Sequence, residues 1–241
     1  MSKFKNAYNL IKRSLFNTGW TCNACGREIF SGYFCDECLK NIVKIGENKC
    51  LHCGRQAPYK TEYCDSCIEK NIGFDVARSV YEYTHPLSIV IQNFKYNNAR
   101  YHAEFFAREM FEVYKAEKLS SDIVTFVPMH QNREQKRGYN QARLLAEELS
   151  KLSGVKLEEC ATKIKETENQ ANLSMSERVK NLKGTFKVDG KLVKGKSVLL
   201  IDDVLTTGST VDVLSTAFKK AGAVKVSVLT LASVSKIVKQ H

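Results

Sequence analysis

Eight of the nine cysteines form four CxxC pairs before residue 68, and this arrangement constrains the chain more than any other feature of its sequence. The pairs are Cys22/Cys25, Cys35/Cys38, Cys50/Cys53 and Cys64/Cys67. Two cysteines at this spacing aim both sulfurs at one point, and a second pair across a short hairpin completes a tetrahedral site of four sulfurs for Zn²⁺. The spacing therefore predicts two structural zinc sites.

The four pairs can combine in two ways. Gaps of nine and ten residues separate the pairs in the first and second half of the block, which suits one short hairpin for each site and favours sequential pairing. A cross-braced module would interleave the pairs. Redox-active dithiols and iron–sulfur clusters also use CxxC pairs, but four pairs at near-equal spacing fit them less well. Because roughly 70 residues bury little surface unaided, we expect zinc to supply most of the folding free energy here.

The charge balance points to an anionic partner. The chain has 37 lysines and arginines against 26 aspartates and glutamates, a formal net charge of +11. Such a surplus favours either nucleic acid or a phosphorylated small molecule. No apolar run approaches the roughly 18 residues that a membrane-spanning helix needs, and residues 1–16 carry no secretory signal pattern. We therefore expect no membrane insertion and a cytoplasmic location.

Beyond residue 74 the hydrophobic pattern alternates between strands and helices. Strands are expected at 76–84, 122–128, 197–201 and 223–233, and helices within 86–118, at 139–154 and at 210–222. Short apolar strands separated by amphipathic helices predict an α/β fold with a mostly parallel sheet flanked by helices. The expected division is an N-terminal helix or extension at 1–20, a double zinc ribbon at 21–74 and the α/β domain at 75–241.

The segment VLLIDDVLTTGST (198–210) carries the strongest functional signal. An apolar strand ends in two acids and is followed by a loop of hydroxyls, one glycine and a helix. In an open α/β sheet, ligands bind at the carboxyl ends of the strands. Gly208 lets the backbone approach an anion, and the N–H groups of the next helix face the same loop. Asp202 and Asp203 can accept hydrogen bonds from vicinal sugar hydroxyls, so the segment predicts a ribose 5-phosphate site.

Two other interpretations of this region fit less well. The strand ending in two aspartates resembles a Walker B strand, and residues 190–197 match the formal P-loop pattern GxxxxGK[ST]. A P-loop must follow a strand and open a helix, whereas this stretch leads directly into the strand at 197–201. A receiver-type acidic pocket has its paired acids early in the domain, not before a TTGST loop.

At the level of motifs, the same segment resembles the 5-phosphoribosyl 1-pyrophosphate (PRPP) motif of type I phosphoribosyltransferases. Over almost the whole chain, the sequence resembles the ComF family of competence-associated, GntX-like proteins, which joins a double zinc ribbon to a type I phosphoribosyltransferase domain. Supporting segments are FKY at 94–96, VPMHQNREQKRGYNQ from 127 and TENQANLSMSERVKNLKGTF at 167–186. Lysines at 163 and 165 stand where the family tends to have arginines, so the charge is kept and the bidentate fork is lost.

The resemblance implies a set of site residues. The PRPP-binding segment would comprise Asp202, Asp203, Val204, Leu205, Thr206, Thr207, Gly208, Ser209 and Thr210. The pyrophosphate side would comprise Val127, Pro128, Met129, His130, Arg133 and Arg137. Asp202 and Asp203 would be the catalytic pair, holding the ribose hydroxyls beside a cation-like sugar, with Mg²⁺ bound through PRPP oxygens and water. The polar segment 162–183 would close over the reacting centre.

Two classes of function remain open at this stage. One is a phosphoribosyltransferase that moves ribose 5-phosphate to an unidentified nitrogenous acceptor and releases pyrophosphate. The other is a non-catalytic competence factor that binds single-stranded DNA and uses the PRPP site as a sensor or phosphate platform, together with other DNA-uptake or recombination proteins. Tyr33, Tyr59 and Tyr63 of the zinc block could stack on bases, or they could form the hairpin core.

Overall fold

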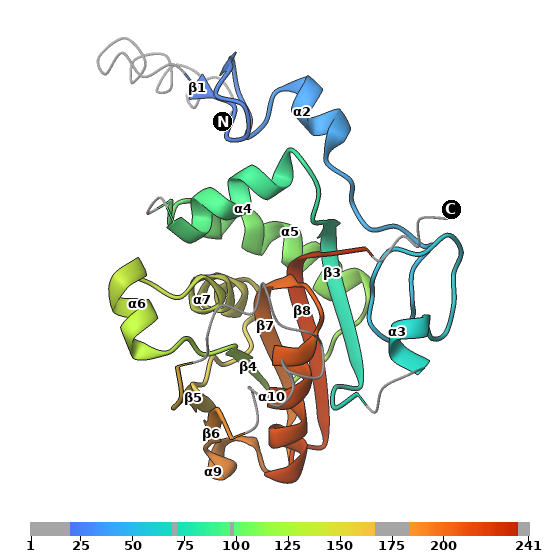
Figure 1. The fold of residues 1–241 in the computed structure, drawn as a ribbon, viewed down its shortest axis with the longest axis vertical. Helices are drawn as coiled ribbons and strands as arrows, with labels where there is room; N and C mark the ends of the chain where they lie inside the picture. The colour runs from blue at the N-terminus through green and yellow to red at the C-terminus, as the bar shows by residue number, and fades with distance from the viewer. Residues whose placement is uncertain (1–19, 69–71, 97–98, 167–183, 236–241) are drawn as a thin grey trace.

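A sheet of four parallel strands forms the centre of the computed structural model, which describes residues 20–68, 72–96, 99–166 and 184–235 (Figure 1). The strands lie in the order β3, β8, β7, β4 and all neighbouring pairs are parallel. Their bounds are Val76–Glu82 for β3, Ile123–Phe126 for β4, Ser197–Leu205 for β7 and Lys225–Ser233 for β8. The predicted α/β class with a parallel sheet is confirmed.

Helices cover both faces of the sheet because its inner strands are apolar on both sides. Leu199 and Ile201 of β7 belong to one core, and Val198 and Leu200 belong to the other. This alternation follows from the two-residue period of a strand. The first core is closed by α4 (Leu87–Tyr96), α5 (His102–Ala116) and α7 (Gln141–Ser153), and the second by α10 (Ser209–Lys220) (Figure 1).

The strand β7 is longer than the sequence pattern indicates. The apolar run suggests an end at Ile201, but the strand continues through both aspartates to Leu205. It does so because β8 is equally long: Asp202 pairs with Thr230, and Leu205 pairs with Ser233. Ladder hydrogen bonds therefore fix the backbone of the two carboxylates. Since successive side chains of a strand point to opposite faces, Asp202 and Asp203 diverge toward different neighbours.

The remaining elements are short. The zinc block contains β1 (Trp20–Thr21), β2 (Glu28–Ile29), α2 (Asp36–Asn41) and α3 (Asp65–Ile68). The α/β part adds α6 (Gln131–Arg137), the antiparallel pair β5 (Ala161–Lys163) and β6 (Phe186–Val188), and α9 (Gly190–Val193). The formal P-loop pattern runs from α9 into β7 and so joins no strand to a following helix. Within the described ranges, no helix has the length and apolar character needed to cross a membrane.

The first half of the zinc block packs onto α5. The ring of Tyr33 stacks on that of Phe105 with a centroid distance of 3.7 Å, and its hydroxyl is hydrogen-bonded to Nδ1 of buried His102. Cys22, Cys35 and Cys38 join the core formed by α5 and α7. Tyr33 is therefore partly buried and packs against the core, whereas Tyr59 and Tyr63 are exposed. Residues 1–19, most of the expected N-terminal extension, lie outside the described residues.

The second half packs directly against the sheet. The N–H of Ala77 in β3 donates to the carbonyl of His52, with 2.7 Å between nitrogen and oxygen. Cys50, Cys53 and Cys67 share a core with Phe74 and with residues of α10. At Gly54 the backbones come so close that an added Cβ would lie 2.4 Å from the carbonyl oxygen of Ala77. The two halves, alike in sequence, therefore contact different parts of the fold.

The contact at Gly54 can be tested with a matched pair of substitutions. Gly26 and Gly54 have the same left-handed backbone, with φ of +74° and +69°, but nothing lies within 4 Å of a Cβ added at Gly26. Both Gly26→Ala and Gly54→Ala should carry about 1 kcal/mol of backbone strain. Gly54→Ala should lower the free energy of unfolding by about 2 kcal/mol more, because β3 must move apart from the CxxC turn that contains Gly54. We call each such turn of a CxxCGR segment a knuckle. Chemical denaturation of both variants measures the difference, and equal losses would show that the knuckle does not rest on β3.

Candidate functional site

The eight paired cysteines form two clusters with sequential pairing. Within each cluster all four sulfurs lie within 4.8 Å of one another. The clusters are Cys22, Cys25, Cys35 and Cys38, and Cys50, Cys53, Cys64 and Cys67. Sulfur–sulfur distances of 3.8 Å for Cys25–Cys35 and 3.7 Å for Cys53–Cys64 are close to the roughly 3.8 Å edge of a tetrahedron with Zn–S bonds of about 2.3 Å. Two structural zinc sites therefore fit this chain, and a cross-braced arrangement does not.

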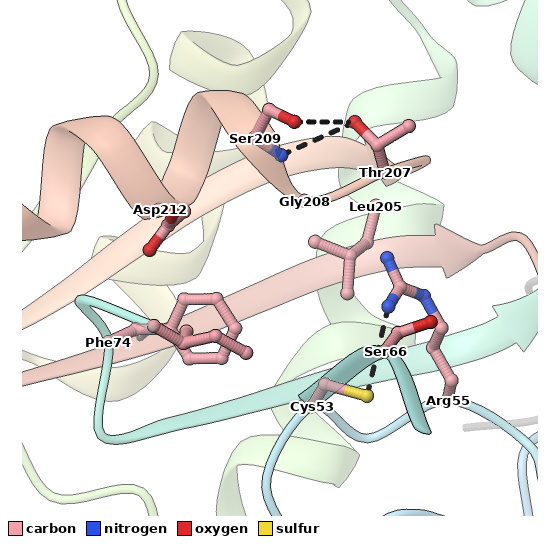
Figure 2. Close-up of a pocket in the computed structure, with 10 residues that line it drawn as sticks. Cys53, Arg55, Ser66, Phe74, Leu205, Thr207, Gly208, Ser209 and Asp212 are labelled. Carbon is pink, nitrogen blue, oxygen red and sulfur yellow. Dashed lines mark hydrogen bonds between the residues drawn. The ribbon is translucent and has the colours of Figure 1, made fainter. Parts of the chain in front are cut away.

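The loop that joins β7 to α10 has the form expected of an anion cradle. Gly208 has a left-handed backbone with φ of +82°, and α10 begins at the next residue. The hydroxyls of Thr207 and Ser209 lie 3.0 Å apart, and Thr207 Oγ1 also accepts from the N–H of Ser209 (Figure 2). The N–H of Ser209 is thus engaged by Thr207, whereas the N–H groups that follow it in the first turn of α10 have no intrahelical acceptor and can bind an anion.

The conformation of Gly208 determines how a larger residue at this position would affect the loop. A Cβ built there would lie 3.6 Å from Arg55 Nη2 and 3.7 Å from Leu205 Cδ1. A side chain would thus point toward the zinc block and not clash at once with its neighbours. Gly208→Val should therefore be harmful through the strain of a β-branched residue at positive φ.

Two lysines face the two aspartates. Lys95, at the end of α4, forms an ion pair with Asp203 at 3.0 Å, and both side chains are largely buried. Lys163 of β5 lies close enough to Asp202 for their charges to interact. Two carboxylates and two ammonium groups thus meet beside the TTGST loop, at the carboxyl edge of the sheet.

The proton affinities reflect this crowding. Burial, and then the like charge of Asp203, raises the pKa of Asp202 from 3.8 to about 7. Burial opposes ionisation of Lys95, but the neighbouring carboxylates of Asp203 and Asp202 outweigh it and raise the pKa of this lysine above its ordinary value. For Lys163, burial and the nearby Arg133 lower the pKa. Asp202 is therefore a carboxyl that exchanges its proton near neutral pH.

The RGYNQ segment (137–141) connects the end of α4 to the loop after β4 through buried hydrogen bonds. The amide of Asn140 donates to the carbonyl of Val127 at 3.0 Å and its oxygen caps α7. The hydroxyl of Tyr139 and the amide of Gln141 donate to the carbonyl of Phe94 at the end of α4. These buried bonds join the predicted pyrophosphate loop, 127–130, to the helix that carries Lys95. The same loop meets β7 where the N–H of Val127 donates to the carbonyl of Ile201 at 2.9 Å.

The basic residues after His130 divide by their contacts. His130 itself caps α6 by accepting from the N–H of Asn132. Arg137 lies over the ring of Tyr96, with 4.8 Å from Cζ to the ring centroid. Arg143 forms ion pairs with Glu147 and Glu159 at 2.9 and 2.8 Å, so its charge is balanced by carboxylates of this chain.

Most of the segment expected to close over the site lies outside the described residues. Of 162–183, only residues 162–166 are described. The segment 167–186, which supports the resemblance to the ComF family, also lies mostly outside the described residues. This includes Thr167, Gln170, Leu173, Arg178 and Asn181, which match the family pattern. Phe186, which also matches it, opens β6.

Both halves of the chain match known domain families. The double zinc ribbon domain matches residues 13–68, and the phosphoribosyl transferase domain matches residues 135–240. Competence protein F of Haemophilus influenzae is 32% identical over 206 residues, which cover 82% of this chain and 89% of that protein. This chain belongs to the ComF family.

Two further relatives support the same assignment to the ComF family. The DNA utilization protein YhgH of Salmonella typhimurium is 30% identical over 203 residues, covering 82% of this chain and 88% of that protein. Competence protein ComFC of Streptococcus pneumoniae is 25% identical over 201 residues, covering 82% of this chain and 86% of that protein. In each case the similarity spans most of both chains.

Sequence reasoning gave no role to two residues that this ComF-family fold brings to the loop. Lys95 was visible as the single cation of an otherwise apolar and amide-bearing helix, within the FKY segment. Arg55 gave no such signal, because it belongs to the zinc block. Its guanidinium donates to the carbonyl of Thr206 at 2.7 Å.

The raised pKa of Asp202 predicts a stability difference that depends on pH. The folded chain binds this proton more tightly than the unfolded chain, so ionisation costs stability as pH rises from about 4 through 7. Asp202→Asn does not ionise, and it should gain on wild type by a few degrees in melting temperature between pH 5 and pH 8. Asp189→Asn, at the N-cap of α9, is the control, because asparagine also caps helices. If the melting temperatures of wild type and Asp202→Asn differ by the same amount at pH 5 and at pH 8, the pKa of Asp202 is not raised.

Proposed function

We propose that this chain is a PRPP-binding, phosphoribosyltransferase-like protein of the ComF type that acts in DNA uptake or natural transformation. The match to phosphoribosyl transferase domains supports the ligand class, and the names of the relatives, competence proteins and DNA utilization proteins, support the process. We also propose that residues 75–241 form the ligand-binding domain and residues 21–74 the double zinc ribbon.

One observation carries the proposal. A pair of adjacent carboxylates, each faced by a lysine, stands beside a hydroxyl-rich loop at the start of a helix. The loop and the N–H groups of α10 would receive a phosphomonoester, while Asp202 and Asp203 would accept hydrogen bonds from the two sugar hydroxyls. On ligand binding, Lys95 and Lys163 would remain near the sugar and balance the two negative charges.

The proposed site also defines how the ribose 5-phosphate group would be transferred from PRPP to an acceptor. The bond between the anomeric carbon and the pyrophosphate oxygen would break, and a bond from that carbon to a nitrogen of the acceptor would form. Ionised Asp202 and Asp203 would stabilise the positive charge that develops on the sugar. Val127–His130 and Arg133 would face the departing pyrophosphate. No general base is assigned among these residues, so the acceptor is left as a nitrogenous compound that loses its proton to solvent.

The donor set bears on Mg²⁺. Within the described residues, the two cysteine clusters are the only groups of three or more metal-ligating side chains that converge. Asp203 is already bound to Lys95. Mg²⁺ would therefore be held mainly by oxygens of PRPP and by water, and would supply charge neutralisation of the leaving group.

Binding of PRPP tests this proposal. Calorimetry with Mg²⁺ present should show PRPP binding to the wild-type chain. Asp203→Asn should weaken it about tenfold or more, because the sugar loses a charged acceptor and Lys95 loses its partner. Asp189→Asn should bind as wild type does. If the wild-type chain binds no PRPP, or if Asp203→Asn binds it equally well, the assignment of the site is wrong. A pyrophosphate-release assay with a panel of bases then separates a transferase from a sensor.

A surface beside the site favours a second function, binding of single-stranded DNA. Tyr96 and Tyr101 expose 70% and 68% of their area, and the guanidinium of Arg137 stacks on Tyr96. Arg100 lies over the ring of Tyr139, at 4.8 Å from the centroid, and donates to the carbonyl of Gly138, the residue after Arg137. Aromatic faces flanked by arginines bind single strands by stacking and by phosphate contacts. Tyr59 and Tyr63 on the second ribbon offer a competing surface.

Two equally exposed tyrosines separate these surfaces. Tyr96 and Tyr59 are each 70% exposed, one beside Arg137 and the other on the zinc ribbon. Tyr96→Ala should weaken binding of a short oligonucleotide about fivefold or more, and Tyr59→Ala should leave it unchanged. Fluorescence anisotropy measures both, and log affinity should fall by roughly 0.7 per phosphate contact for each log unit of salt. The opposite ranking would move the DNA to the ribbons, and no binding at about 50 mM salt would remove this second function.

A further inference from the structure

The sequence around the CxxC pairs contains a short repeat whose two copies have different surroundings. CxxCGR occurs at Cys22–Arg27 and again at Cys50–Arg55. Arg27 extends into solvent, pairs with Glu37 at 2.8 Å and has a side chain that is 61% exposed. Arg55 is only 6% exposed. The local chain is the same in both, so the burial of Arg55 comes from the docking of the second knuckle on β3.

Arg55 connects the second cysteine cluster to the TTGST loop. Nη2 donates to the carbonyl oxygen of Thr206 at 2.7 Å. Figure 2 shows the second contact, in which Nη1 lies 3.9 Å from the sulfur of Cys53. The buried Nε of Arg55 finds no protein acceptor within the described part of the chain. An unpaired buried donor is unfavourable, so the burial of Arg55 requires compensating contacts by its two other nitrogens. Among the described residues, the bond to Thr206 is the shorter of the two that the guanidinium makes, since Nη1 lies 3.9 Å from the sulfur of Cys53, which is a thiolate when zinc is bound.

The pocket around Arg55 is too small for the ligand itself. It holds about 30 Å³ and is lined by Cys53, Arg55, Ser66, Ile72, Phe74, Leu205, Thr207, Gly208, Ser209 and Asp212. That is room for one or two waters, one of which could accept from Nε, but not for a sugar phosphate. Arg55 therefore lies beneath the loop and acts on a ligand through the loop.

The geometry of the peptide bond supplies the mechanism. In a trans peptide the carbonyl and the following N–H point in opposite directions. By holding the carbonyl of Thr206 toward the ribbon, Arg55 turns the N–H of Thr207 away from the ribbon, toward the outer side of the loop. The guanidinium also offsets part of the net negative charge of a zinc ion bound by four thiolates, which would otherwise repel an anion across the loop. Asp212 opposes the positive charge of Arg55, but its carboxylate is engaged by the N–H of Gly73 at 2.6 Å.

We propose that Arg55 of the second zinc ribbon is a positioning residue for the TTGST loop, so that this ribbon and the α/β domain together build one site for a phosphomonoester. This inference rests on the proposed function, because it assumes that the loop binds the 5-phosphate of a ribose. It gives the second ribbon a part in ligand binding that the first ribbon, with exposed Arg27, does not have.

The test compares Arg55→Met, Arg55→Lys and the matched control Arg27→Met. Calorimetry uses two separate probes, ribose 5-phosphate and inorganic pyrophosphate. Arg55→Met should weaken ribose 5-phosphate binding about tenfold to a hundredfold, the loss typical of a charge-assisted bond, and should change pyrophosphate binding less than about twofold. Arg55→Lys keeps the charge but not the fork, so it should fall between the two. Arg27→Met should bind both probes as wild type does.

Two further measurements separate positioning from a loss of structure. Metal analysis should find two zinc ions in every variant, and the amide resonance of Thr207 should shift in Arg55→Met without ligand. If Arg55→Met loses zinc, the test rests on Arg55→Lys. Binding of ribose 5-phosphate to Arg55→Lys as tight as to wild type would then overturn the inference.

Each remaining outcome has one meaning. If wild type binds ribose 5-phosphate and both Arg55 variants bind it equally well, the inference is wrong and the proposed function stands. If Arg55→Met weakens both probes alike, or Arg27→Met matches it, Arg55 does not position this loop. If the wild-type chain binds neither ribose 5-phosphate nor PRPP, the proposed function fails and the inference fails with it.

Discussion

The pairing of β7 with β8 along its whole length is the constraint on which the site depends. It keeps the backbone extended beyond the apolar run, through two consecutive acids, to Leu205. Two adjacent carboxylates on a loop would separate and hydrate. Held in a ladder, they remain partly buried and repel each other, and Asp202 keeps its proton up to about pH 7. Burial of the apolar residues that flank the acids in both strands supplies the free energy that compensates for this repulsion.

The lysine facing Asp203 depends on a second, polar layer. Lys95 ends α4, and the carbonyls at that helix end are bound by Tyr139 and Gln141. Asn140, between them, binds the carbonyl of Val127. One five-residue segment therefore sets both the helix end that supplies a cation and the loop next to β7. Tyr139, Asn140 and Gln141 therefore act on the backbone around the site.

The zinc block shows how one motif acquires two roles. Each CxxCGR copy contributes two of the four sulfurs of one cluster, and in each copy the glycine has a positive φ. The first cluster packs through Tyr33 onto α5, whereas the second approaches β3 so closely that only glycine fits at position 54. That approach buries Arg55 and brings it to Thr206. The difference arises from what each knuckle contacts and not from the knuckle itself.

Local chemistry and hydrophobic period were enough to predict much of this protein. The cysteine spacing predicts two clusters, the period of apolar residues predicts the parallel sheet, and Asp-Asp followed by a hydroxyl loop predicts where a ligand would bind. These features depend on residues near one another in the chain. The length of β7, the pair Lys95–Asp203 and the burial of Arg55 depend on contacts between residues far apart in sequence. Arg55 and Thr206 are 151 residues apart, and only the folded sheet brings them together.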